Sequence, residues 1–251
     1  MAIDLDLKGK TVLVTGGASA IGEAIVCAFA KPGSKVGYVD IDQITGEALA
    51  AELISGGHAV QFRALDLRDI AALKYAIADL RDALGPICIL VNNAADDARH
   101  TAESVTPEDF DDQIAVNLRH QFFASQAALP DMEAAGGGSI ICMRSITWMV
   151  GFGGKPIYTT SKAAIIGLVR SLARDFGPAN IRINAISPGW VITKRELELW
   201  LTPEADAERH SRQAIKRRIY PDTIATLTLV LASEDASAIT GQNYVADGNW
   251  V

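Results

Sequence analysis

Short runs of apolar, mostly β-branched residues alternate with longer segments of helical periodicity along the whole chain. The apolar runs predict strands at Thr11–Thr15, Val36–Asp40, Ala59–Asp66, Ile87–Asn92, Ile140–Met143, Ile181–Ile186 and Asn243–Ala246. The amphipathic or alanine-rich segments predict helices that include Ala71–Leu84, Pro107–Ala135, Ile157–Phe176 and Thr223–Ala232. Strand–helix alternation favours right-handed crossovers between parallel strands. The pattern therefore predicts an α/β fold with a doubly wound, seven-stranded parallel sheet and helices on both faces.

No linker or repeat interrupts this alternation, so the 251 residues are predicted to form a single domain, 1–251. One segment departs from the pattern. Thr193–Arg218 is charged and irregular, and it lies between the sixth predicted strand and the last predicted helix. A long insertion at such a place is typical of a lid or a surface excursion. We expect residues 193–218 to be a mobile substrate lid that orders when ligands bind.

The charge balance narrows the class of partner. A net charge of −7 argues against nucleic acid, because phosphate binding needs clustered lysines and arginines, and against an anionic membrane. Asp4 and Asp6 interrupt any apolar core of a secretion signal, and no apolar stretch is long enough to span a bilayer. The scattered Cys27, Cys88 and Cys142 indicate thiols in a reducing compartment. We therefore expect a cytoplasmic protein, and the spacing of its histidines predicts no metal site.

A glycine-rich turn directly follows the first predicted strand and opens a helix. Its residues Gly16, Ser19, Ile21 and Gly22 suit a backbone that turns sharply and meets a pyrophosphate at a helix N-terminus. Asp40 ends the second predicted strand about 20 residues later, where an acid can bind the adenosine ribose 2′-hydroxyl. A carboxylate there repels a 2′-phosphate, and no nearby arginine or lysine offsets it. The pattern favours NAD over NADP.

Tyr158 and Lys162 stand four apart in a predicted helix, so their side chains share one face. A free phenol has a pKa of about 10 and is a poor base at neutral pH. A neighbouring ammonium lowers that pKa by stabilising the phenolate, which makes the pair a workable general base. Ser145, at the end of the fifth predicted strand, could hold a substrate oxygen beside the tyrosine.

With these residues in this order, the chain from Lys8 to Gly248 resembles the short-chain dehydrogenase/reductase family, whose fold is of the Rossmann type. The resemblance implies that Tyr158 takes the hydroxyl proton, that Lys162 lowers its pKa and holds the nicotinamide ribose, and that Ser145 positions the substrate. It also implies that Asn117 supports a proton relay. Further cofactor contacts implied by the family's motifs are Asp66, Leu67, Asn93, Ala94, Pro188, Gly189, Val191 and Thr193.

The chain departs from the family pattern at three glycine positions. Ala20 replaces the second glycine of the loop, and its methyl group could crowd a pyrophosphate. Ala95 and Asn249 also stand where glycine is usual. None of these departures touches the residues implied in proton transfer.

Within the family, local segments are most similar to sugar 1-dehydrogenases that act on pentoses such as xylose or arabinose. This similarity implies oxidation at C1 of a cyclic aldose to an aldonolactone. A sugar needs polar contacts and an apolar platform for its C–H face, which aromatic rings provide. The candidate substrate residues are Asp97, Arg99, His100, Ser145, Trp148, Trp190 and Trp200. Each tryptophan could equally be an ordinary packing residue.

Two alternatives remain open from sequence. The first is a reductase of a 3-oxoacyl thioester or another ketone, for which Lys194, Arg195, Lys216, Arg217 and Arg218 could form a basic patch. The second is an NAD-binding regulator without chemistry, which fold alone does not exclude. The resemblance also implies that the long helices pack across subunits of a homotetramer or dimer with closed symmetry.

Overall fold

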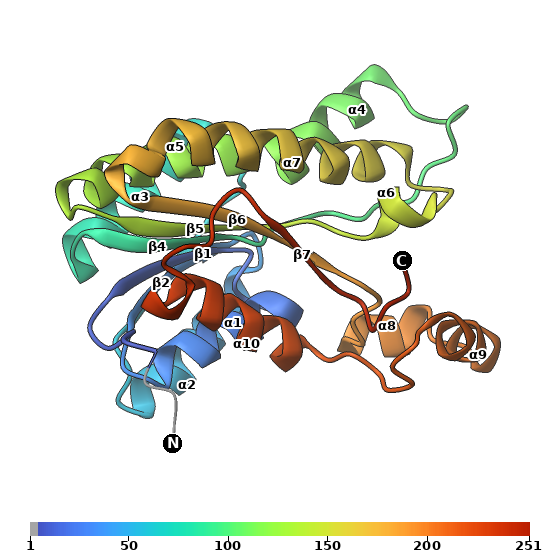
Figure 1. The fold of residues 1–251 in the computed structure, drawn as a ribbon, viewed down its shortest axis with the longest axis horizontal. Coiled ribbons are helices and arrows are strands. Elements are labelled where there is room, and N and C mark those ends of the chain that lie inside the picture. Colours follow the sequence, from blue (N-terminus) through green and yellow to red (C-terminus); the bar gives the residue numbers. More distant parts are fainter. Residues whose placement is uncertain (1–4) are drawn as a thin grey trace.

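The computed structural model describes residues 5–251 and confirms the predicted α/β architecture (Figure 1). One seven-stranded sheet has the order β3-β2-β1-β4-β5-β6-β7, and all its pairings are parallel. The strands are β1 Thr11–Thr15, β2 Lys35–Asp40, β3 Val60–Ala64, β4 Ile87–Asn92, β5 Gly138–Met143, β6 Ile181–Pro188 and β7 Asn243–Ala246. The strand order reverses between β1 and β4, which is where ligands bind in open sheets of this kind.

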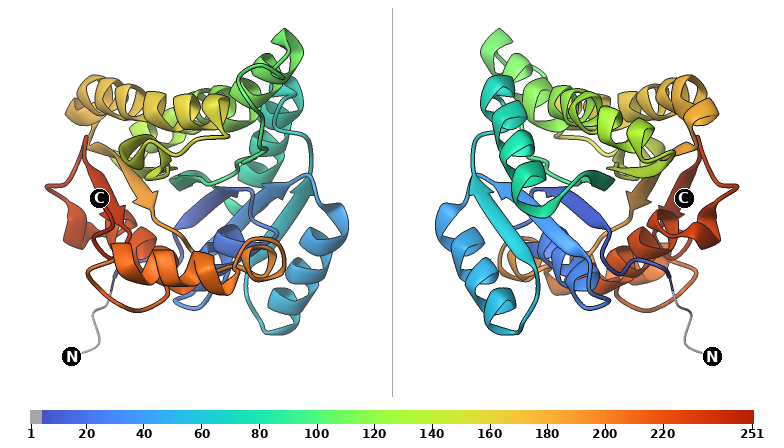
Figure 2. Two further views of the ribbon diagram at one scale, coloured as in Figure 1. Left: turned by 90° about the vertical axis from the view of Figure 1, so that its right-hand side faces the viewer. Right: turned by 90° about the vertical axis from the view of Figure 1, so that its left-hand side faces the viewer.

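Helices cover both faces of the sheet. The α-helices are α1 Ala20–Ala30, α2 Gln43–Ser55, α3 Ile70–Leu84, α4 Pro107–Ile114, α5 His120–Ala134, α6 Thr147–Val150, α7 Pro156–Phe176, α8 Lys194–Leu199, α9 Pro203–Arg212 and α10 Pro221–Ala232. Figure 1 shows α3, α5 and α7 on one face and α1, α2 and α10 on the other, and the end-on views of Figure 2 show the sheet between these layers. Helices α6, α8 and α9 gather at one end of the sheet.

Each face of the sheet carries its own apolar core, because alternate residues of a strand point to opposite faces. Val12 and Val14 of β1 belong to the core under α1 and α10, which also contains Phe29. Leu13, between them in sequence, belongs to the core under α3, α5 and α7, together with Ile165. All five side chains are buried. Burial on both faces explains why the strands are apolar at consecutive positions.

The structure corrects two predicted elements. Pro107–Ala135, expected as one helix, consists of α4, a π-helical turn at Ala115–Arg119 and α5. The π turn adds a residue to the helical repeat without introducing a proline or glycine, so the hydrophobic pattern gives no sign of it. The segment Thr193–Arg218, expected to be irregular, contains α8 and α9. Ser145 lies beyond the end of β5, which finishes at Met143.

Two negative findings apply to the described residues. Within 5–251 no helix is both long and apolar enough to cross a membrane. The same part of the chain contains no group of three or more histidine, cysteine or acidic side chains arranged to hold a metal ion.

Candidate active site

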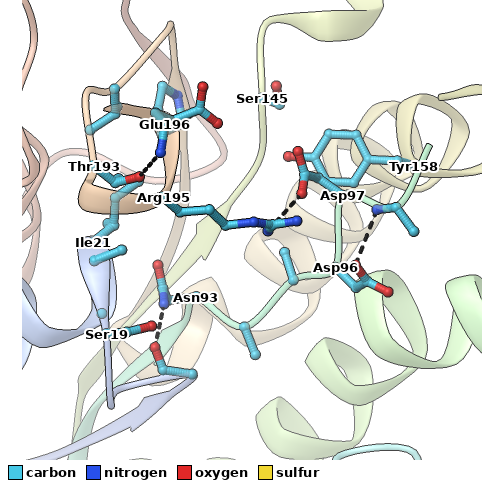
Figure 3. Close-up of a pocket in the computed structure, with 18 of the residues that line it drawn as sticks. Ser19, Ile21, Asn93, Asp96, Asp97, Ser145, Tyr158, Thr193, Arg195 and Glu196 are labelled. Atoms are coloured by element: carbon cyan, nitrogen blue, oxygen red, sulfur yellow. Dashed lines mark hydrogen bonds and ion pairs between the residues drawn. The ribbon is translucent and has the colours of Figure 1, made fainter. Parts of the chain in front are cut away.

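A large cleft of about 1980 Å³ opens at the carboxyl ends of the strands. Because the strands are all parallel, the loops that follow β1, β2, β4, β5 and β6 meet at this single edge. Helix α8 and the first part of α9 contribute to the opposite wall. Figure 3 shows residues from these loops pointing into the cleft.

The glycine loop after β1 forms one end of the cleft and is held very tightly. Gly16 has φ +67°, and a Cβ atom there would lie 2.6 Å from the Cα of Ala94. A Cβ on Gly22 would lie 1.8 Å from the carbonyl oxygen of Gly16. That same carbonyl accepts a hydrogen bond of 2.7 Å from the amide of Asn93 (Figure 3). Only glycine fits at 16 and 22.

The loop and its surroundings fit a dinucleotide. Ser19 is the N-cap of α1 and lines the cleft, but its side chain makes no cap hydrogen bond, so it leaves the first-turn N–H groups open to another partner. Such a helix N-terminus suits a phosphate. Asp40, at the end of β2, also lines the cleft, and its carboxylate accepts hydrogen bonds from the N–H groups of Ala18 (3.0 Å) and Asp42 (3.1 Å). These bonds fix the carboxylate where a ribose diol could reach it.

The other expected cofactor contacts outside α7 also line the cleft: Ile21, Asp66, Leu67, Ala94, Pro188, Gly189, Val191 and Thr193. Asp66 is ion-paired with Arg68 at 2.6 Å. Gly189 lies close to the chain at Asp247, since a Cβ at 189 would meet the Cβ of Asp247 at 2.6 Å. This contact gives Gly189 a steric role whether or not it touches a cofactor.

Tyr158, Lys162 and Ser145 converge as expected. Tyr158 and Lys162 lie in the first two turns of α7, and the Lys162 Nζ atom is 5.5 Å from the centroid of the Tyr158 ring. The ammonium is held by a hydrogen bond of 2.9 Å to the carbonyl oxygen of Met143, at the end of β5. Ser145 and Tyr158 both line the cleft (Figure 3). The last strand residue of β5 therefore anchors the lysine, and the loop just beyond it supplies the serine.

Electrostatically, the pair differs from the sequence expectation. Burial raises the pKa of the Tyr158 phenol above its ordinary value, and a hydrogen bond with Ser145 only partly opposes this. Burial also lowers the pKa of Lys162 to about 7, because the residue is only 1% exposed. Desolvation disfavours the charged form of both groups. In the protein alone, burial is therefore the dominant influence on the pKa of both groups.

Asn117 lies fully buried in the π turn between α4 and α5. Its Oδ1 accepts from the N–H of Asp96 at 3.1 Å, and its Nδ2 donates to the carbonyl oxygen of Asp96 at 2.9 Å. The amide also contacts Gln113, one turn earlier. Its side chain thus fixes the loop after β4, the loop that carries Asp97.

Charged residues surround the end of the cleft next to Tyr158. Asp97 accepts hydrogen bonds from Lys155 (2.5 Å) and Arg195 (3.0 Å). The guanidinium of Arg99 stacks over the Trp200 ring at 3.5 Å. These side chains come from the β4 loop, the residue before α7, and α8 with the turn after it. His100 and Trp190 line the same cleft.

Trp148 is the one candidate substrate residue that does not line the cleft. It lies on α6, is 39% exposed, and its ring faces the guanidinium of Arg144 at 5.0 Å. Helix α6 turns this side chain outward, whereas Thr147 and Val150 on the same helix do line the cleft.

Sequence reasoning missed two residues of the site, Lys155 and Glu196. Lys155 is buried, and Glu196 accepts a hydrogen bond from the indole N–H of Trp190. A sequence signal for Lys155 was its position immediately before Pro156. Proline is common at N1 of a helix, so Lys155 is expected at the N-terminal end of the helix that carries Tyr158. The sequence signal for Glu196 was Thr193, three residues earlier, because a threonine followed by glutamate at this spacing marks the start of a helix, here α8.

Comparison with known proteins identifies the family. Residues 16–249 match the family model described as enoyl-(acyl carrier protein) reductase. The chain is 44% identical to a probable galactose dehydrogenase of Rhizobium meliloti over 97% of this chain and 95% of the relative. It is 42% identical to D-xylose 1-dehydrogenase of Caulobacter vibrioides over 99% and 98%. This chain is a short-chain dehydrogenase/reductase.

Solved structures agree with this membership. A 3-oxoacyl (acyl-carrier-protein) reductase of Agrobacterium tumefaciens, determined with NADP bound, superimposes with a TM-score of 0.90 at 32% identity, covering 99% of this chain and 98% of that one. A putative short-chain alcohol dehydrogenase of Sinorhizobium meliloti superimposes with a TM-score of 0.92 at 30% identity, covering 98% of both chains. As a short-chain dehydrogenase/reductase, the protein is an oxidoreductase that uses a nicotinamide dinucleotide and a small-molecule substrate.

Proposed function

We propose that this enzyme oxidises the C1 hydroxyl of an aldose, a pentose such as L-arabinose or D-xylose, to the aldonolactone. The names of its relatives support a sugar: galactose for one and D-xylose for another. The observation that carries the proposal is the placement of Asp97 and Lys155, which puts a carboxylate and an ammonium in the cleft beside Tyr158. Paired charges of this kind suit a polyhydroxylated substrate.

Each residue of the site has its own role in the proposed reaction. Tyr158 takes the proton from the reacting hydroxyl, and Ser145 donates a hydrogen bond that holds the substrate oxygen in place. Lys162 holds the nicotinamide ribose and, when charged, stabilises the phenolate. Asn117 supports the path by which the proton leaves, in addition to fixing the loop of Asp97. A bound nicotinamide would accept the hydride from the substrate carbon.

We propose NAD as the cofactor. The carboxylate of Asp40 lines the cleft at the end of β2 and is fixed there by two backbone N–H groups. It would accept hydrogen bonds from a ribose diol and repel a 2′-phosphate. The related structure with NADP bound belongs to a reductase only 32% identical, so the test below uses both cofactors.

A 3-oxoacyl or other ketone reductase is the second candidate, favoured by the description of the matching family model. It needs accessible basic residues for an acidic carrier. Several of the candidate cations are engaged within the chain: Arg195 with Asp97, Arg218 with Asp206, and Lys216 with the carbonyl oxygen of His210. A regulator without chemistry would not need Ser145, Tyr158 and Lys162 brought together.

The test is a spectrophotometric panel. Pentoses, hexoses and 6-deoxy sugars are offered with NAD and with NADP, and 3-oxoacyl thioesters with NADH and NADPH. We expect at least one aldose to be oxidised with NAD, with a kcat/KM at least about tenfold above that with NADP, as one unfavourable charge contact predicts. Oxidation of acyclic alcohols or steroids but no sugar would overturn the substrate assignment.

We further propose a cytoplasmic homotetramer in which residues 193–218 act as the lid. The unpaired Cys27, Cys88 and Cys142 support a reducing compartment. The lid proposal is supported by α8, which lines the cleft and is tied to its floor through the contact of Arg195 with Asp97.

A further inference from the structure

Asp97 lies at the centre of a small group of charges that the catalytic residues do not account for. Its Oδ2 accepts a hydrogen bond from Lys155, and its Oδ1 accepts one from Arg195. The side chain of Arg195 is 62% exposed, whereas that of Lys155 is 10% exposed. The Arg195 contact is therefore a weak surface ion pair. The Lys155 contact is largely shielded from water, so the two groups hold each other in a fixed geometry.

This pair lies directly beside the reacting centre. The Lys155 Nζ atom is 5.6 Å from the centroid of the Tyr158 ring, almost the same distance as Lys162. The negative charge of Asp97 is close enough to act on the phenol of Tyr158, whose pKa it helps to raise. Figure 3 shows Asp97 next to Tyr158, with Arg195 reaching it from α8. Asp97, Lys155 and Tyr158 line the same cleft.

The pair retains hydrogen-bonding capacity. An ammonium has three donors, and the bond to Asp97 uses one of them. An ionised carboxylate has about four acceptor sites, of which Lys155 and Arg195 use two. Burial opposes the ionisation of Asp97, but the hydrogen bond from Lys155 and the charges of Lys155, Arg195 and Arg99 outweigh it. Together they hold the pKa of Asp97 below its ordinary value, so the carboxylate stays charged. A hydroxyl both donates and accepts, and a fixed carboxylate beside an ammonium complements both roles at once.

We propose that Asp97 and Lys155 form a subsite that binds the hydroxyl next to the reacting carbon, the 2-hydroxyl of a sugar oxidised at C1. This subsite depends on the proposed aldose oxidation, and it explains how the enzyme distinguishes a sugar from an alcohol without a neighbouring hydroxyl. Arg195 on α8 contacts Asp97 at 3.0 Å, so the lid segment contributes to the subsite. A 3-oxoacyl substrate has no hydroxyl to offer it.

The experiment combines enzyme variants with substrate deletion. The kcat/KM of the wild-type enzyme, Lys155→Met and Asp97→Asn is measured with the best sugar, with its 2-deoxy analogue, and with a secondary alcohol that has no other hydroxyl. Lys31→Met removes an exposed lysine from the end of α1, remote from the subsite, and serves as the matched control. NAD affinity of each protein is measured by tryptophan fluorescence.

For the wild-type enzyme, we expect removal of the 2-hydroxyl to lower kcat/KM about 10- to 100-fold, the size of a hydrogen bond to a charged group. In Lys155→Met, the ratio of kcat/KM on the sugar to kcat/KM on the 2-deoxy sugar should fall about 10- to 100-fold, toward one, beyond any change that all three substrates share. NAD affinity should not change. Asp97→Asn should show the same pattern with a smaller loss, because an amide still bonds the hydroxyl.

An equal loss on all three substrates would show that Lys155 acts on Tyr158 rather than on the sugar, and would overturn the subsite while leaving aldose oxidation intact. Undiminished sugar oxidation by both variants would overturn it as well. A wild-type enzyme that oxidises the simple alcohol but no sugar would refute the proposed function, and the subsite with it.

Discussion

Tyr158 and Lys162 are paired in a region where water is scarce, and this sets the protonation of both. Burial raises the pKa of the phenol and lowers that of the ammonium to about 7. The ammonium of Lys162 therefore loses its proton more readily than that of a surface lysine, and the charge of a bound ligand can change its protonation. A group in this state can respond to a bound ligand in a way that a surface lysine with an ordinary pKa cannot.

The pKa of Lys162 has a consequence for stability. The folded protein, with a pKa of about 7, binds fewer protons at this site than the unfolded chain, whose pKa is 10.5. Between these values the free energy of unfolding rises with pH. From pH 7 to pH 9 the gain from this group should be about 2 kcal/mol in the protein without ligands. Urea unfolding of wild type and Lys162→Met at both pH values isolates the gain, and parallel pH profiles would contradict it.

A second residue-scale prediction concerns Ala20, which departs from the family glycine. Its φ is +53°, a conformation that costs an L-residue about 1 kcal/mol. Ala20→Gly should raise the free energy of unfolding by about 1 kcal/mol and lower the KM for NAD by removing the methyl group from the loop. Asn249, with φ +61°, provides the control, because asparagine tolerates this region and Asn249→Gly should change stability by only a few tenths. A destabilised Ala20→Gly protein would refute the strain.

The positions of most site residues could be predicted from the sequence, because these residues belong to short motifs that follow the ends of predicted strands or share one face of a predicted helix. Tyr158 and Lys162 share a helix face by spacing alone, and Asp40 ends a strand. Trp148 could not be placed in the same way, since the direction in which a four-residue helix turns its side chains depends on tertiary packing. The rise in the pKa of Tyr158 was also beyond sequence, because it depends on burial.

Two elements next to the site, the π turn and helix α9, were not predicted from the sequence. The π turn Ala115–Arg119 places Asn117 inside the molecule, where it braces the β4 loop. Its hydrophobic pattern continues into both flanking helices, so sequence predicts one helix. The start of helix α9 carried a sequence signal, because Thr202 is its N-cap and Pro203 stands at N1. The helix was still missed, because its many charged residues resemble an irregular surface segment.

At the element scale, we predict that α8 and α9 gain order on ligand binding. Helix α8 has six residues, none of them buried, and its contact with the cleft floor includes the exposed Arg195–Asp97 pair. Amide hydrogen exchange across 193–218 should slow at least about tenfold with NAD and sugar together, whereas α10 should change little. Equal exchange with and without ligands would contradict the lid.

The candidate site residues lie at one edge of the sheet, at the carboxyl ends of the strands, because all the strands are parallel. The alternation of strands and helices predicts this arrangement, so fold and site location followed from the sequence together. The surface that joins subunits could not be derived in the same way, since exposed apolar residues such as Phe122 on α5, 41% exposed, form no sequence pattern that marks an interface.

We predict that the enzyme is a homotetramer with α5 and α7 at a subunit interface. Sedimentation equilibrium should then give four times the 26.7 kDa mass of one chain. Phe122→Asp should weaken the assembly, because it places a charge in an apolar interface. Ile44→Asp, at an isoleucine 83% exposed on α2 on the other face of the sheet, offers a control with the same change of charge. A wild-type protein that sediments as a single chain would contradict the assembly.

The most direct test of the account is Tyr158→Phe, which removes one hydroxyl oxygen and nothing else. The variant should fold, bind NAD as wild type does in a fluorescence titration, and lose at least about a thousandfold in kcat on the best substrate, within the range for losing a general base. Tyr75→Phe, at a tyrosine 77% exposed on α3, should be fully active. Oxidation of the substrate at the wild-type rate by a folded, NAD-binding Tyr158→Phe enzyme would contradict the account.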